Sequence, residues 1–216
     1  MDDWLQDPLI KEGSFEYKQP TALNGQIYEK CRTFHFATRL KLDGADYFCR
    51  ILLGAASRPI DLGLPLLAHR LTKWYLDAFF FELISAYDTL LQEINVLYKV
   101  KLDIDKVNWE SIKGKLSSTL KNSMEKERET EWFKKLRWYR NTTTHHAYVP
   151  ISTFLSGSGE HRLDYDHHEV SLQYFDNKTG EIKEEQIDKA CPSYLENMIR
   201  HIQTVWQKLA EEFNFS

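Results

Sequence analysis

A short segment of the chain combines a guanidinium, an amide, hydroxyls and imidazoles. Arg140 and Asn141 are followed by three threonines and then by His145 and His146. Helical periodicity places Arg140 on the apolar face that carries Phe133. A guanidinium on that face needs an anionic or carbonyl partner, and phosphate is one such group. Because imidazole exchanges protons near neutral pH, the segment has the groups needed for phosphate binding and proton transfer.

The same segment is locally basic. The stretch from Lys134 to His146 contains no acid and four fixed positive charges, which are Lys134, Lys135, Arg137 and Arg140. The whole protein carries a net charge of −4, so its surface as a whole is not built to hold nucleic acid. Any such binding would require a local basic patch, and this segment predicts one with phosphate as its ligand.

This segment resembles the motif of the HEPN superfamily, which is an arginine, a polar residue that is often asparagine, a few further residues and a histidine. Arg140-Asn141 is separated from His145 by four residues and from His146 by five, counted from the arginine, and both spacings fall in the family's range. A subset of the family continues as His-x-Tyr, which His146-Ala147-Tyr148 matches. The preceding Trp-Tyr pair and the amphipathic stretch 81–88 are also similar to the family.

The resemblance implies a helical domain that dimerises and places two Arg/His sets in a shared cleft. Many such domains are metal-independent RNases, in which the histidine handles the proton of the ribose 2′-hydroxyl or of the leaving oxygen. Arg140 would then hold the phosphate, Asn141 would orient one of the reacting groups, and either His145 or His146 would act. Other members are non-catalytic. The leading hypothesis is therefore a nucleic-acid-processing RNase, and the alternative is a dimeric helical module that binds a nucleotide, RNA or a protein partner.

The candidate residues also have a purely structural interpretation. Arg140 could form an ion pair with a buried carboxylate, such as Glu82 or Asp88. His145 and His146 could lie at a solvated helix end, where the helix dipole favours cations.

A second group of ionisable residues lies between positions 161 and 168. Arg162 with His167 or His168 repeats the arginine-to-histidine spacing, but no asparagine follows, and we interpret the match as fortuitous. The stretch also offers metal ligands, namely His161, Asp164, Asp166, His167 and His168. Because adjacent histidines on a strand point to opposite faces, they do not form a shared ligand set, and we expect neither a metal nor a cofactor.

The elements around the motif predict an all-α bundle of four to five helices with a small β-hairpin inserted before the last helix. Residues 24–42 fit a helix or a strand, and we favour a helix that ends near Asp43-Gly44. After that end, helical spacing resumes over residues 47–55. The other predicted helices cover about 64–99, a short stretch after an Asn108 cap, a stretch from a Ser123 cap to about Asn141, and Pro192 to the end. The hairpin is expected within 160–187, with a turn at 177–180.

We expect one domain over residues 1–216, with an irregular lead-in at 1–20. Hydrophobic residues make up 42% of the 216 residues, which is enough to form a hydrophobic core. The sequence contains no run of 18 apolar residues, so we expect no membrane-spanning helix. Three widely spaced cysteines and the absence of a signal peptide predict a cytoplasmic protein. We expect a homodimer, with Trp132, Trp138 and Tyr139 contributing to an aromatic-rich interface.

Overall fold

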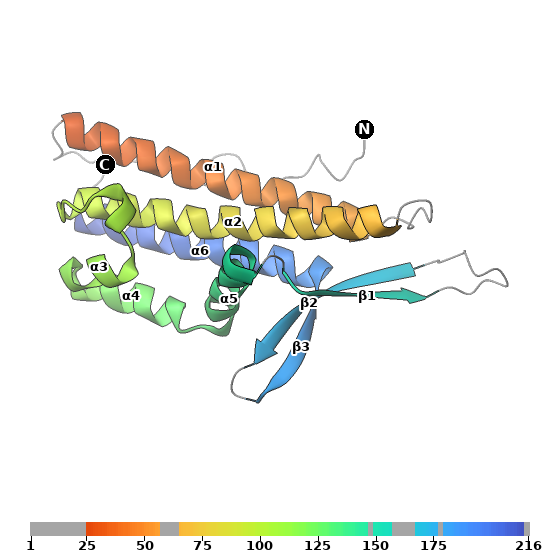
Figure 1. Ribbon diagram of the computed structural model, residues 1–216. Helices are drawn as coiled ribbons and strands as arrows, with labels where there is room; N and C mark the ends of the chain where they lie inside the picture. Colours follow the sequence, from red (N-terminus) through yellow and green to blue (C-terminus); the bar gives the residue numbers. More distant parts are fainter. Residues whose placement is uncertain (1–24, 57–64, 147–148, 157–166, 177–178, 214–216) are drawn as a thin grey trace.

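The computed structural model describes residues 25–56, 65–146, 149–156, 167–176 and 179–213. These residues form α1 (Gly25–Ala56), α2 (Pro65–Leu97), α3 (Trp109–Ile112), α4 (Ser118–Arg128), α5 (Glu131–His146), β1 (Ile151–Ser156), β2 (His167–Asp176), β3 (Glu181–Gln186) and α6 (Ile187–Glu212). The lead-in expected at 1–20 lies outside them. The long helices α1 and α2 run antiparallel, α6 lies against them, and the sheet projects from the bundle (Figure 1). The all-α bundle is thus confirmed.

The predicted hairpin is present, but a third strand extends it. β2 pairs antiparallel with β3, as expected, and also pairs antiparallel with β1, which gives the strand order β1-β2-β3. Ile151 of β1 lies opposite Leu172 of β2, and Leu172 is fully buried. The first strand escaped prediction because no alternation of apolar and polar residues marks its sequence.

Helix α1 continues through Asp43-Gly44, so the predicted helix end there is wrong. A Cβ atom on Gly44 would lie 3.3 Å from Cγ of Glu82, and the missing side chain therefore allows α1 to lie close to α2. Asp46, in the next turn, is buried and pairs with Arg50 at 2.9 Å, one turn further along the same helix. The glycine serves helix packing here rather than helix termination.

The segment between α2 and α5 differs from the prediction in its boundaries. The Asn108 cap is confirmed, because its Oδ1 accepts a hydrogen bond from the Ser111 backbone N–H at 3.1 Å. Ser123 is not a cap, since it lies inside α4, whose N-terminus is capped by Ser117. Helix α5 also continues past Asn141 to its last residue at position 146. The low helix propensity of threonine costs less than about 0.7 kcal/mol per residue, too little to end a helix anchored in the core.

Aromatic side chains from α2, α5 and α6 fix the position of α5. The ring of Tyr139 is fully buried and stacks on Phe80 with the ring centroids 4.7 Å apart. Tyr194 of α6 meets the same Phe80 ring edge-on at 5.9 Å. The helix that carries the candidate motif is therefore held by the centre of the core. Among the described helices, none combines the length and the hydropathy needed to cross a membrane.

Candidate active site on helix α5

Four of the five candidate residues lie on α5. Arg140 is half-buried and Asn141 is exposed, while His145 and His146 form the last two positions of the helix. The side chains of these histidines, and Tyr148 altogether, lie outside the described residues. An α-helix turns by about 100° per residue, so the backbone positions of His145 and His146 lie about 140° and about 120° around the helix from that of Arg140, in opposite directions, and neither shares the side of the helix that carries Arg140.

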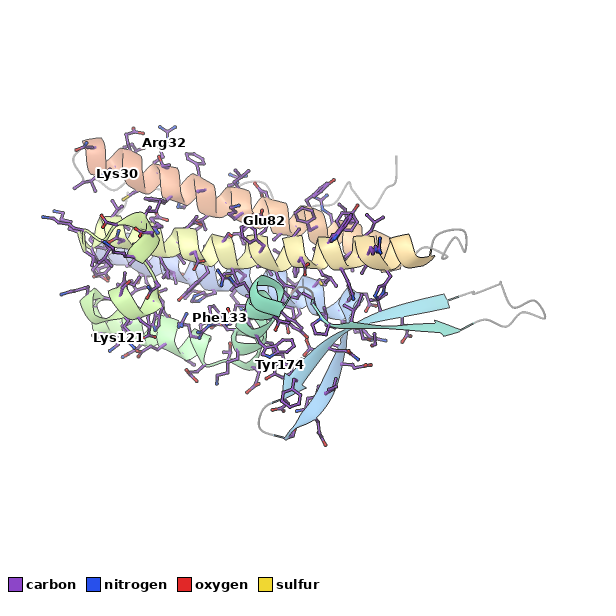
Figure 2. The ribbon with its side chains drawn as sticks, viewed as in Figure 1. Lys30, Arg32, Glu82, Lys121, Phe133 and Tyr174 are labelled. Carbon is purple, nitrogen blue, oxygen red and sulfur yellow. The ribbon has the colours of Figure 1, made fainter. Side chains whose placement is uncertain are left out.

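Asp88 on α2 is the acidic neighbour of Arg140. The surrounding protein raises the pKa of the Asp88 carboxyl, while the positive charges of Arg140 and then Arg128 lower it. Asp88 is nevertheless exposed, so the two charges are not sealed in the core. Glu82, the other carboxylate considered for Arg140, lies on α2 and pairs instead with Lys41 of α1 at 3.0 Å (Figure 2).

The basic run predicted along α5 is partly neutralised by acids from elsewhere in the sequence. Lys134 forms an ion pair with Glu129 at 2.9 Å, and Lys135 pairs with Glu185 of β3. Arg137 is exposed and forms no salt bridge within the described part of the chain. Arg137 and Arg140 are three residues apart and therefore share one side of the helix. Two guanidiniums therefore lie on this side of α5, of which Arg137 is the one exposed to solvent.

A comparison with models of known protein families identifies the family of this chain. Residues 66–214 match the family model described as Cthe2314-like HEPN, a span that contains α5, α6 and all of α2 except its first residue. The chain belongs to the HEPN family. No curated protein and no solved structure matches it. Membership of the HEPN family suggests a nucleic-acid-related or RNase-like function.

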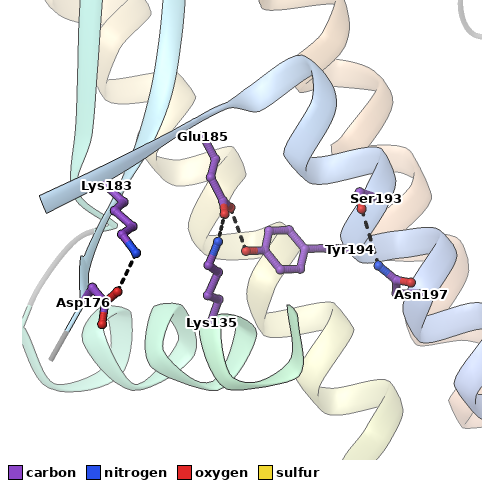
Figure 3. A network of polar contacts seen from close by, with 7 residues as sticks. All are labelled: Lys135, Asp176, Lys183, Glu185, Ser193, Tyr194 and Asn197. Carbon is purple, nitrogen blue, oxygen red and sulfur yellow. Dashed lines mark hydrogen bonds and ion pairs between the residues drawn. The ribbon is translucent and has the colours of Figure 1, made fainter. Parts of the chain in front are cut away.

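A polar network outside the motif ties α5 of this HEPN chain to the sheet and to α6 (Figure 3). Glu185 accepts hydrogen bonds from Lys135 and from the Tyr194 hydroxyl, the latter at 2.9 Å. Burial lowers the pKa of the Lys135 ammonium and raises that of the Tyr194 phenol. The network positions the middle of α5. Sequence reasoning missed it, because its members lie 50 and 9 residues apart in the chain.

Arg128 is a second arginine that sequence reasoning missed. Its guanidinium lies over the rings of three aromatic side chains at 5.1–5.7 Å, namely Trp109, Phe133 and Tyr87. Its Nη1 also donates a hydrogen bond to the Tyr87 hydroxyl at 3.1 Å. Such stacking stabilises the guanidinium, whose positive charge lowers the pKa of Asp88. No local sequence signal identifies it, because it lies between two glutamates.

Of the three aromatic residues predicted for a dimer interface, Tyr139 lies in the core, while Trp132 and Trp138 are half-buried. Tyr139 is fully buried, Trp138 packs edge-on against Tyr174 at 5.3 Å, and the Trp132 indole donates a hydrogen bond to Glu127. Exposed large hydrophobic residues lie instead along α1 and α2, and we name this set the α1–α2 apolar face: Phe36, Leu40, Tyr47, Trp74 and Phe81.

The structure describes none of the side chains of the possible metal site at residues 161–168. His161, Arg162, Asp164 and Asp166 are not described, and only the backbone positions of His167 and His168, at the start of β2, are. Among the described residues, no group of three histidine, cysteine or acidic side chains could hold a metal ion.

Proposed function

We propose that this HEPN protein is a metal-independent endoribonuclease whose phosphate site is built on α5. The observation that carries the proposal is the half-buried Arg140, which lies beside the exposed Arg137 on a helix anchored in the core. Two guanidiniums on one side of a rigid helix suit the oxygens of a phosphodiester. Asn141, His145, His146 and Tyr148 complete the proposed site.

In the proposed reaction, one of the two histidines removes the proton from a ribose 2′-hydroxyl. The 2′-oxygen attacks the adjacent phosphorus, the bond to the 5′-oxygen of the next nucleotide breaks, and that oxygen receives a proton. The products are a 2′,3′-cyclic phosphate and a 5′-hydroxyl. Arg140 stabilises the charge that develops on the phosphate oxygens, and Arg137 contributes a second contact. DNA lacks the nucleophile and is not cleaved.

The proposed RNase is a homodimer that joins through the α1–α2 apolar face. Phe81 and Asp88 are seven residues apart on α2 and therefore lie on the same side of that helix. Asp88 in turn lies near Arg140, whose positive charge lowers the pKa of the Asp88 carboxyl. A second copy that covers the exposed Trp74 and Phe81 would thus lie next to the α5 site, which supports a cleft shared by two copies.

Asp88 itself favours a second candidate function. The negative charge of a carboxylate beside Arg140 weakens the attraction of Arg140 for a phosphate. An internal partner of this kind is typical of a structural ion pair and therefore suits a non-catalytic dimeric module. Such a module would bind a nucleotide, RNA or a protein partner without cleaving it.

The deciding experiment is cleavage of a labelled single-stranded RNA in the presence of EDTA, with the products identified by mass spectrometry. We expect cyclic phosphate ends, and no cleavage of the DNA of equal sequence. Arg140→Ala and the double variant His145→Ala/His146→Ala should lose activity, since one positioned acid–base group contributes about 10²–10⁴-fold.

Arg162→Ala and His167→Ala are the matched controls for these variants, because they remove the same residue types from the match judged fortuitous. Both should cleave like the parent protein. Circular dichroism must show that each variant keeps its helix content. The RNase proposal is wrong if the parent protein does not cleave RNA. It is also wrong if a folded Arg140→Ala/His145→Ala/His146→Ala variant cleaves RNA as well as the parent does. Either result favours the non-catalytic binding module.

A further inference from the structure

A cavity of about 600 Å³ opens at the end of the bundle where α1 begins and α2 ends. This end lies away from the sheet, at the far end of α2 from β1 and β2 (Figure 1). Its apolar lining comes from both helices and from the segment after α2, and consists of Ile27, Phe34, Val96, Leu102 and Ile104. A volume of this size is typical of sites for small molecules.

Two amide side chains of α2 hold the wall of this cavity in a fixed shape. Asn95 donates from Nδ2 to the Leu102 carbonyl at 3.1 Å and accepts from the Leu102 N–H at 3.2 Å. Gln92 donates from Nε2 to the Ile104 carbonyl at 2.7 Å. The segment that closes the cavity is therefore held by three side-chain contacts and is formed before any ligand arrives.

The backbone of this wall adopts a conformation that side chains disfavour. Lys99 and Lys101 have φ angles of 51° and 64°, and within the described chain no other non-glycine residue has a positive φ. Both side chains line the cavity. Glycine would adopt these angles without steric cost, whereas the Cβ atom of lysine makes them less favourable. Lys99 has this conformation because it ends α2: the Val100 N–H bonds to the Asn95 carbonyl at 3.0 Å and the Lys99 N–H to the Val96 carbonyl at 3.1 Å, which is the pattern of a left-handed helix C-cap. The cap and the second positive φ at Lys101 together turn the chain so that both residues lie at the cavity.

The charges around the cavity complement an anion. Lys30, Lys99 and Lys101 line it, and none of them forms a salt bridge in the described part of the chain. Glu29, the one acid among the described lining residues, pairs with Arg32 at 3.8 Å. Lys30 and Arg32 both lie at this end of α1 (Figure 2). The lining thus combines an apolar interior with excess positive charge.

We propose that this cavity binds a small amphipathic molecule with an apolar body and one acidic head group, carboxylate or phosphate. The apolar body lies between Phe34 and Val96, and the head group meets the ammonium groups of Lys99 and Lys101. The site is separate from α5 and independent of the proposed RNase activity.

Isothermal titration of the full chain with decanoate, below its micellar concentration, tests the proposal. Decyl phosphate in parallel distinguishes the two head groups, while decanamide offers the same chain without charge and acetate the charge without a chain. We expect saturable binding of one decanoate or decyl phosphate per chain, at least tenfold tighter than binding of decanamide or acetate. Nuclear magnetic resonance shifts should be concentrated at residues 26–34 and 92–104.

Lys99→Gln/Lys101→Gln should weaken binding of the charged probe at least tenfold and leave decanamide unaffected. Lys115→Gln/Lys126→Gln removes the same charge from two exposed lysines outside the cavity and should bind like the parent chain. Ile104→Glu, at a side chain 67% exposed, keeps the fold and should also weaken the charged probe. Equal affinity for decanoate, decyl phosphate and decanamide, or parent-like binding by Lys99→Gln/Lys101→Gln, overturns the proposal, as does the absence of saturable binding.

Discussion

The Trp206 indole of α6 donates a hydrogen bond to Oε2 of Glu93 on α2 at 2.9 Å. The other carboxylate oxygen of Glu93 lies 3.5 Å from Nδ1 of His35 on α1, and the His35 ring lies against Trp206 with centroids 3.9 Å apart and the ring planes inclined by 31°. Glu93 is only 1% exposed. One buried carboxylate therefore joins the three long helices of the bundle.

Replacing Glu93 by alanine should lower the free energy of unfolding by about 3 kcal/mol. The change leaves the Trp206 N–H without its Glu93 acceptor and removes the carboxylate beside the buried His35 imidazole, which costs far more than the loss of a surface contact. Glu125→Ala is the control, since it removes one half of an i,i+4 pair with Lys121 at 3.9 Å and should cost less than about 0.5 kcal/mol. Urea denaturation measures both, and similar losses in the two variants would contradict the prediction.

Stability should fall in mild acid because of His201. Burial, and then the charge of Arg128, lowers the pKa of this imidazole from 6.5 to about 4. Between these values the unfolded chain binds a proton that the folded chain does not, so the contribution of His201 is complete above pH 6.5 and is lost as the pH falls towards 4. From pH 7 to pH 5 the loss is about 2 kcal/mol.

The variant His201→Phe isolates this contribution. Phenylalanine keeps the ring contacts with Tyr87 and Phe133 but does not titrate. Denaturation at pH 7 and pH 5 should show a smaller pH dependence in the variant than in the parent chain, by about 2 kcal/mol. An identical pH dependence in both proteins would assign the acid sensitivity to other groups.

Asp88→Asn should strengthen RNA binding by about threefold, because it removes a negative charge beside Arg140 while keeping the shape of the side chain. Fluorescence anisotropy with a 2′-O-methyl RNA, which lacks the attacking hydroxyl, measures binding without cleavage. The gain should shrink at high salt. Asp103→Asn, in an exposed pair with Lys106, is the control and should bind like the parent chain. Weaker binding by Asp88→Asn would show that the carboxylate positions Arg140 rather than competing with phosphate.

The double variant Trp74→Glu/Phe81→Glu should convert the proposed dimer into a monomer. Both side chains are more than half exposed, so charges there disrupt an interface and not the core. Light scattering at micromolar concentration measures the mass. Phe175→Glu/Ile182→Glu places two charges on a facing pair of exposed residues in the sheet and should remain dimeric. A monomeric parent chain refutes both the dimer and the shared cleft.

The parts of the fold that sequence patterns predicted are those with local causes. The apolar stripe of α6, the capping residue Asn108 and the turn before β3 each act over a few neighbouring residues. The close approach of α1 to α2 at Gly44 brings Glu82, which lies 38 positions away, next to the glycine, and this contact leaves no signal in the local pattern. Strand β1 likewise exists because β2 is available to pair with it.

The candidate site was predictable to a similar extent. The motif placed Arg140 on a helix with a core-facing side, and α5 has that character. Its electrostatics were not predictable, since the charges of Lys134 and Lys135 are balanced by Glu129, before the basic run, and by Glu185 in the sheet. The aromatic enclosure of Arg128 likewise combines side chains from three different helices.

Strand β3 passes directly into α6, since Gln186 ends the strand and Ile187 begins the helix. No side chain caps the start of that helix, and Glu185 is held at the junction by Lys135 and Tyr194. We therefore expect amide hydrogens in the first turn of α6 to exchange with solvent together with those of β3, when β3 separates from β2. An opening of this junction would also separate Glu185 from Lys135 of α5.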